Sequence, residues 1–197
     1  KKDVEAELPV RLEQVVELDC GDFRLSETEK AELWAWMQGK KIKGLKRPKH
    51  LSERQLEVSH HKLRVLSEMY EGLDKAVFFT WYKQTARDLG KALGCDVITG
   101  DMTIKKRQEL IDKFQSGEIS RLVATGCSIG TGFNLYNGEY VVFAEFPWTW
   151  SEAEQWLSRV ERIGNKKCTV VYPVAMRSIE EIIWKGLIER KGLSTII

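Results

Sequence analysis

The chain has 197 residues and a mass of 22.7 kDa, enough for one well-filled hydrophobic core. Hydrophobic residues make up 43% and charged residues 30%, with 15 Gly and 4 Pro, which excludes collagen-like, low-complexity and disordered chains. No apolar run reaches the roughly 20 residues of a membrane helix, so we expect no membrane partner. The opening KKDVEAEL has neither an initiator Met nor an apolar signal, which predicts an intracellular fragment of a larger protein, cytoplasmic or nuclear.

The spacing of the cysteines and the distribution of charge indicate which metals and partners to expect. The four cysteines are far apart and form no CxxC pair, so we expect reduced thiols and no metal site. The net charge of +2 by itself indicates no nucleic-acid partner. Between residues 33 and 52, however, there are six cations and no acid, namely Lys40, Lys41, Lys43, Lys46, Arg47 and Lys49.

The first 72 residues predict a strand and two helices. VRLEQVVEL, residues 10–18, begins with apolar and polar residues in alternation and predicts a strand. Ser26 is suited to cap a helix that runs to residue 37, and residues 39–50 predict a loop. A second helix is expected over 52–70, ending near Gly72. Its apolar face would carry Leu56, Leu63, Leu66 and Met69.

From about residue 73, short apolar runs alternate with helical stretches. The runs are AVFFTWY, DVITG, RLVAT, EYVVFAEF and TVVYPVA, and helices are expected over 83–93, 104–115, from 151 onward and over 178–190. Nearly continuous apolar strands separated by helices indicate an α/β fold with a parallel sheet covered on both faces. In such a sheet, ligands bind where the chain leaves the carboxyl ends of the strands.

Glycines follow one of these strands closely. In GCSIGTGFNL, Gly126, Gly130 and Gly132 permit close approach of the backbone to a ligand, and Asn134 can bind a loop or a phosphate. A structural turn between strand and helix explains the same glycines, and the pattern alone leaves both readings open.

Two arginines recur at helical spacing after another strand. In QWLSRVERIGN, Gln155, Arg159 and Arg162 are separated by four and three residues, so on a helix they would share one face. Paired guanidinium groups suit an anionic ligand such as a nucleotide γ-phosphate. The alternative is a surface ion-pair ladder with Glu152, Glu154 and Glu161.

Taken in order, these segments resemble the second RecA-like domain of superfamily-two helicases, in particular the Swi/Snf-like DNA translocases. QWLSRVERIGN is similar to motif six, QAxxRxxRIGQ, with Asn165 where Gln is usual, and ATGCSIGTGFNL is similar to motif five, STxAGGxGINL, with Ser128 and Ile129 where Ala and Gly are preferred. AVFFTWY resembles motif four, and ITGDMTIKKRQELIDKF resembles the block after it. VVFAEFPW and IIWKGLIERK are closest to the annealing-helicase branch related to HepA.

The resemblance implies a two-part chain: residues 1–72 as an inter-lobe linker and helical extension, and residues 73–197 as the RecA-like lobe. It also implies ATP and Mg²⁺ as cofactors, both held mainly by an N-terminal RecA-like lobe that would be a partner of this one. The sequence has no GxxxxGK[ST] phosphate loop and no Asp-Glu pair, so we expect no ATP hydrolysis by this chain alone.

The family's roles transfer to matching positions. Arg162 is the first candidate for an arginine finger and Arg159 its partner, while Gln155, Gly130, Gly132 and Asn134 would lie at the nucleotide. Thr80 and Trp81 would contact the backbone of double-stranded or branched DNA, although packing at a sheet edge explains Trp81 equally well. The six cations from Lys40 to Lys49 would track phosphates, or form a solvated loop.

Several residues favour a structural reading, and two further functions stay open. Trp148 and Trp150 are expected to pack in the interior, and His60 and His61 to be polar helix residues without a metal. A RecA-like module that binds nucleic acid or protein without turnover is one alternative to the translocase. A strand-separating helicase is the other.

Overall fold

The computed structural model describes residues 10–39, 48–129, 134–161 and 167–194. Within these ranges, six parallel strands form one sheet in the order β1-β6-β5-β2-β4-β3. The strands are β1 (Val10–Leu18), β2 (Ala76–Thr80), β3 (Asp96–Ile98), β4 (Arg121–Thr125), β5 (Tyr140–Phe143) and β6 (Lys167–Ala175). The α/β parallel fold expected from the sequence is therefore confirmed.

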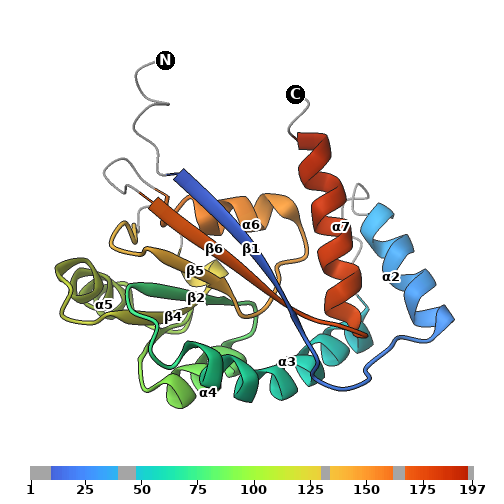
Figure 1. Ribbon diagram of the computed structural model, residues 1–197, viewed down its shortest axis with the longest axis horizontal. Helices are drawn as coiled ribbons and strands as arrows, with labels where there is room; N and C mark the ends of the chain where they lie inside the picture. Colours follow the sequence, from blue (N-terminus) through green and yellow to red (C-terminus); the bar gives the residue numbers. More distant parts are fainter. Residues whose placement is uncertain (1–9, 40–47, 130–133, 162–166, 195–197) are drawn as a thin grey trace.

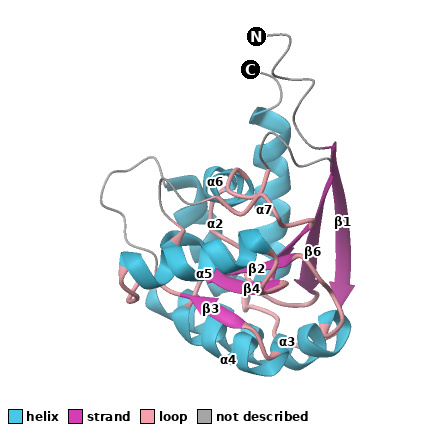
Figure 2. Ribbon diagram, turned by 90° about the vertical axis from the view of Figure 1, so that its left-hand side faces the viewer, coloured by secondary structure: helices cyan, strands magenta, loops and turns pink. Residues whose placement is uncertain are grey.

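Helices cover both faces of this sheet (Figures 1 and 2). They are α2 (Glu27–Gly39), α3 (Lys49–Tyr70), α4 (Lys83–Leu93), α5 (Ile104–Ser116), α6 (Trp150–Leu157) and α7 (Ile179–Ser194), with a short 3-10 turn η1 (Gly126–Ser128). Alternate strand residues point to opposite faces, so Phe78 packs with α3 and α4 in one core cluster. Its neighbour Phe79 packs in the other, with α2, α5, α6 and α7.

Local sequence explains the clearest helix boundaries. Ser26 accepts a hydrogen bond from the Glu29 N–H at 3.2 Å, and its own N–H donates to the Glu29 carboxylate at 2.8 Å, which is a capping box. Gly94 ends α4 and Gly117 ends α5, both in the left-handed conformation with positive φ that glycine adopts without steric cost.

Helix α3 differs from the expectation in length and in buried face. It begins at Lys49 rather than at residue 52, and Met69, expected on the apolar face, is 46% exposed. Polar residues take buried positions instead, because partners elsewhere in the fold satisfy them. The buried residues are Leu51, Gln55, Val58, Ser59, Lys62, Leu66 and Tyr70.

The strand from the expected N-terminal extension joins the sheet. β1 pairs with β6 along nine residues, from Val10 opposite Lys167 to Leu18 opposite Ala175. Helix α2 packs against α7, where Met37 Cε lies 2.3 Å from the position that a Cβ at Gly186 would occupy. Among the described helices, none is long and apolar enough to cross a membrane.

Candidate functional site

The chain changes direction within the sheet at β2. After β4, which lies on one side of β2, the chain continues to β5 on the other side. In parallel α/β sheets, the crevice at such a switch, outside the carboxyl ends of the strands, is the usual ligand site. The segments that follow β2, β4 and β5 start at this edge, because all three strands run in the same direction.

Trp156 on α6 joins these segments. Its indole packs against the rings of Phe79, Trp81 and Phe143, with centroid distances of 5.5, 6.0 and 5.8 Å. A Cβ at Gly126, directly after β4, would lie 1.7 Å from Trp156 Cε2. Trp81 thus packs against Trp156, as the structural alternative predicts, and it also keeps part of its surface exposed.

A backbone hydrogen bond connects the two motif segments predicted to bind nucleotide. The N–H of Leu135, at the end of the glycine-rich segment, donates to the Arg159 carbonyl at 2.7 Å. Asn134 accepts a hydrogen bond from Gln115 at its carbonyl, and its side-chain Oδ1 is buried without a partner among the described residues. The segments around Asn134 and Arg159 are therefore held side by side, whereas Gly130, Gly132 and Arg162 lie outside the described residues.

The helix expected to carry Gln155, Arg159 and Arg162 ends before Arg159, and Arg162 lies outside the described residues. Helix α6 ends at Leu157, with Ser158 as its C-terminal cap, and the chain turns there. Gln155 is exposed on α6, while the N–H of Arg159 donates to the Trp156 carbonyl at 3.1 Å within the turn. The N–H groups of Val160 and Glu161 both donate to the Leu157 carbonyl at 2.9 Å, so the chain continues in turns, while the Arg159 carbonyl accepts the Leu135 N–H.

Arg11 on β1 fixes the residue that precedes Arg162. Its guanidinium donates to both carboxylate oxygens of Glu161 at 2.5 Å and to Glu154 at 3.1 Å. Burial by itself would lower the pKa of Arg11, but these hydrogen bonds outweigh it and raise the pKa, so the guanidinium stays charged. Two of the acids in the expected ion-pair ladder, Glu154 and Glu161, are thus bound to β1, a pairing that the sequence pattern did not indicate.

Glu145, after β5, is a buried carboxylate that shapes the loop after β2. It accepts hydrogen bonds at 2.8 Å from the N–H groups of Trp81 and Tyr82 and from the Thr85 hydroxyl. Burial raises the pKa of Glu145, while these bonds and one from Ser59 oppose the shift. Thr80 is fully buried, and its hydroxyl donates to the Tyr82 carbonyl at 3.4 Å. In this loop, the surface available to a ligand therefore belongs to the residues after Thr80, beginning with Trp81.

A buried ion pair connects α3 to α7. Lys62 Nζ lies 2.7 Å from Glu180 Oε2, both side chains have no solvent exposure, and Glu180 Oε2 also accepts the Ala175 N–H at 3.2 Å. The ammonium lies 5.1 Å from the ring centroid of Phe146, whose carbonyl accepts from Gln55 at 3.0 Å. Helix α3 is therefore tied to the chain after β5 and after β6.

Other sequence predictions have simpler outcomes. Trp148 and Trp150 are buried, and Trp148 meets Trp36 edge-on at 5.3 Å, which confirms their packing role. Lys49 is exposed on α3 and pairs with Glu53 at 3.1 Å, while Lys40, Lys41, Lys43, Lys46 and Arg47 lie outside the described residues. No group of three His, Cys, Asp or Glu in the described part of the chain could hold a metal ion.

Comparisons with known proteins agree on one family. The model of the helicase conserved C-terminal domain matches residues 61–164, more than half of the chain. The DNA repair and recombination protein RAD54-like of Drosophila yakuba is 33% identical over 136 residues, covering 64% of this chain and 17% of that protein. The Drosophila erecta protein of the same name matches with the same identity and coverage. The chain therefore spans less than a fifth of the length of these relatives.

A solved structure supports the fold. The C-terminal part of the Fun30 ATPase domain superimposes with a TM-score of 0.57 at 22% identity, covering 64% of this chain and 45% of that one. At this identity the likeness shows the fold alone.

Proposed function

Because the chain belongs to the helicase conserved C-terminal domain family and is the C-terminal RecA-like lobe of a Swi/Snf-like helicase, we propose that it works as half of an ATP-dependent double-stranded DNA translocase. The other half would be an N-terminal RecA-like lobe that holds most of the ATP and Mg²⁺, with residues 1–72 leading from one lobe to the other. The observation that carries this proposal is the Leu135 to Arg159 hydrogen bond of 2.7 Å. It joins the two motif segments at the switch point of the sheet.

The side chains at this edge suit a nucleotide phosphate. Arg159 follows α6 in the turn, and Arg162 comes directly after Glu161, which Arg11 holds in place. Guanidinium groups match phosphate oxygens, so Arg162 and Arg159 would stabilise the negative charge that develops on the γ-phosphoryl group when the two lobes close.

Two groups of residues would hold the DNA backbone. The loop after β2 presents Trp81, with Thr80 buried behind it, and the buried Glu145 carboxylate accepts the N–H groups of Trp81 and Tyr82. The six cations from Lys40 to Lys49 would add contacts to phosphates. Since phosphate contacts carry little sequence information, we expect little sequence specificity.

The experiment is ATP hydrolysis by the intact parent protein with and without duplex DNA, in wild type and in a variant with the six cations changed to Gln. Duplex DNA should stimulate hydrolysis, and this chain alone should hydrolyse no ATP. The variant should bind DNA with a flatter salt dependence, by up to about 0.9 in log–log slope for each phosphate that a cation no longer neutralises. DNA-independent turnover would favour the non-catalytic binding module, and separation of the strands would favour the unwinding helicase.

A further inference from the structure

Strand β1 has a free hydrogen-bonding edge. It is the last strand of the described sheet and pairs with β6 on one side. The Met176 N–H donates to the Leu18 carbonyl at 2.9 Å, so even-numbered residues of β1 direct their backbone groups at β6. Alternate residues point to opposite edges, which leaves the N–H and C=O groups of Val15 and Glu17 at the outer edge. No described residue bonds to them there.

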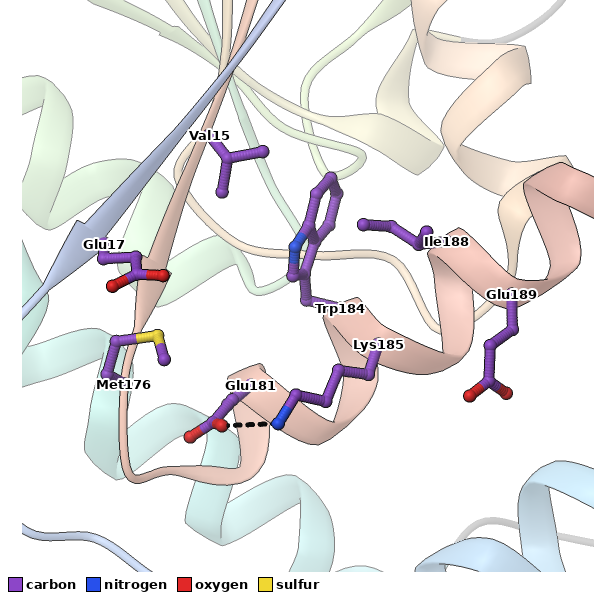
Figure 3. A pocket seen from close by; sticks show the side chains of 8 residues that line it. All are labelled: Val15, Glu17, Met176, Glu181, Trp184, Lys185, Ile188 and Glu189. Carbon is purple, nitrogen blue, oxygen red and sulfur yellow. Dashed lines mark hydrogen bonds and ion pairs between the residues drawn. The ribbon is translucent and has the colours of Figure 1, made fainter.

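An apolar groove runs beside this edge, between β1 and α7 (Figure 3). It encloses about 320 Å³, and Val15, Met176, Trp184 and Ile188 form its apolar part. Val15 is 49% and Ile188 44% exposed, and their side chains lie on either side of the Trp184 indole (Figure 3). The residue with free backbone groups therefore also places its side chain in the groove.

Among the described residues that line the groove, three are acidic and one, Lys185, is basic. Glu17 and Glu189 line it, both are exposed, and neither pairs with a described residue. Glu181 is different, because it binds Lys185 at 2.7 Å (Figure 3) and accepts the Arg177 N–H at 2.9 Å. Two carboxylates without an ion-pair partner among the described residues, next to an apolar floor, favour a ligand that combines apolar side chains with cations.

We propose that the outer edge of β1 and this groove form a docking site for an extended polypeptide segment in which an apolar residue has Lys or Arg two positions before and after it, on the same face of the strand. The segment adds as a further strand, bonding to the backbone of Val15 and Glu17. One apolar side chain enters the groove beside Trp184, and the cations two residues before and after it, which point to the same face, reach the carboxylates at the rim. This interaction is separate from the proposed nucleotide and DNA contacts and requires neither ligand.

The charge of β1 argues against a second copy of this chain as the occupant. β1 carries Glu13 and Glu17 and one cation, Arg11, which is already bound to Glu161 and Glu154. Pairing of β1 with another β1 would bring acidic side chains together across the new edge, and like charges on neighbouring strands are destabilising. A basic segment reverses the sign of this interaction.

The test uses the 197-residue chain and a fluorescein-labelled nine-residue peptide, the Val–Lys peptide, with Val at its centre, Lys two residues before and after the Val, and Thr elsewhere. In the control peptide Glu replaces both Lys residues. Fluorescence anisotropy at about 0.15 M salt, a screening length of about 8 Å, compares wild type with the Glu17→Lys, Glu189→Lys double variant. A matched control, Glu71→Lys with Glu109→Lys, changes the net charge equally at two exposed acids elsewhere. Hydrogen exchange then measures the exchange rate of each backbone amide of β1, with and without the peptide.

The Val–Lys peptide should bind wild type and the matched control with equal affinity. Its affinity for the Glu17→Lys, Glu189→Lys variant should be about tenfold or more lower. It should slow exchange at Val15 and Glu17, and leave Val16 unchanged, since the even-numbered amides already bond to β6. Equal binding of both peptides, equally weakened binding in both double variants, or absence of new protection at Val15 and Glu17 would overturn the proposal. Dimerisation of the free chain through β1 would also overturn it.

Discussion

Gly126 and Trp156 fit one another so closely that a Cβ at position 126 would lie 1.7 Å from the indole Cε2. Gly126 begins the segment after β4, and Trp156 stands on α6 where the resembling motif, QAxxRxxRIGQ, has Ala. The missing side chain on one segment makes room for the large one on the other. This contact keeps the glycine-rich segment against the helix that leads to Arg159.

Gly126→Ala should therefore destabilise the fold by overpacking. Real Cβ contacts do not come this close, and the neighbouring atoms belong to a rigid ring, so we expect a loss of about 1–3 kcal/mol or more in unfolding free energy. In a Trp156→Ala background the same change should cost little. Chemical denaturation of the four proteins in this cycle gives the coupling energy.

Gly100→Ala is the matched control, because a Cβ there meets only Lys83 Cε, at 3.9 Å, in ordinary contact. It should leave stability within about 0.5 kcal/mol of wild type. A Gly126→Ala penalty that persists unchanged without the indole would show that Trp156 is not its cause.

The buried Lys62–Glu180 pair predicts a second stability effect. Lys62→Met leaves the Glu180 carboxylate buried without its cation, which should cost about 3–5 kcal/mol. Adding Glu180→Gln should recover part of that loss, since Gln retains an oxygen for the Ala175 N–H. The exposed pair Lys49–Glu53 provides the comparison, and Lys49→Met should change stability by less than about 1 kcal/mol. Similar losses at both lysines would contradict the role assigned to burial.

The capping box of α2 predicts a pH dependence. Hydrogen bonds from Ser26 and Arg54 lower the pKa of Glu29 to about 2, below its ordinary value, so the folded state binds this proton less tightly than the unfolded state. Its stabilising contribution is therefore present above about pH 4.5 and is lost as the pH falls toward 2. Glu29→Gln should lower the melting temperature at pH 7, and the difference from wild type should shrink between pH 5 and pH 3. A constant difference across that range would rule out ionised Glu29 as its source.

Arg11 predicts an effect on catalysis in the parent protein. It binds no proposed ligand but holds Glu161, the residue before Arg162, so it is a positioning residue. Arg11→Met should lower kcat for DNA-stimulated ATP hydrolysis about tenfold with a smaller change in KM, because a misplaced finger weakens the transition state. Arg64→Met removes an exposed arginine from an ion pair with Glu68 and should leave kcat unchanged. Equal kcat values in Arg11→Met and wild type would remove Arg11 from this role.

Short-range patterns in the sequence were sufficient for most of the fold. The expected ranges of β1, β4 and α4 match the structure residue for residue, because apolar runs and a terminal glycine mark their ends locally. The polar face of α3 could not be predicted in this way. Gln55 and Lys62 have the composition of an exposed stripe, and only their partners on other elements, the Phe146 carbonyl and the Glu180 carboxylate, explain their burial.

In the candidate site, too, features with a local sequence signal could be predicted and features set by distant contacts could not. Motif order indicated which segments meet, whereas the bond that joins them, between Leu135 and Arg159, links residues 24 positions apart in the chain and has no local signal. Glu145 had a detectable signal, since an acid at the end of the apolar run VVFAEF requires buried partners. Arg11 had none, because its contact with Glu161 joins residues 150 positions apart.

The most direct test of the central claim is single-turnover ATP hydrolysis by the intact parent with saturating duplex DNA, in wild type and Arg162→Ala, beside the ATP dissociation constant of each. If Arg162 is the arginine finger, hydrolysis should fall by about 10³-fold or more, while the ATP dissociation constant changes much less. Hydrolysis at the wild-type rate in Arg162→Ala would contradict the account and return Arg162 to a structural role.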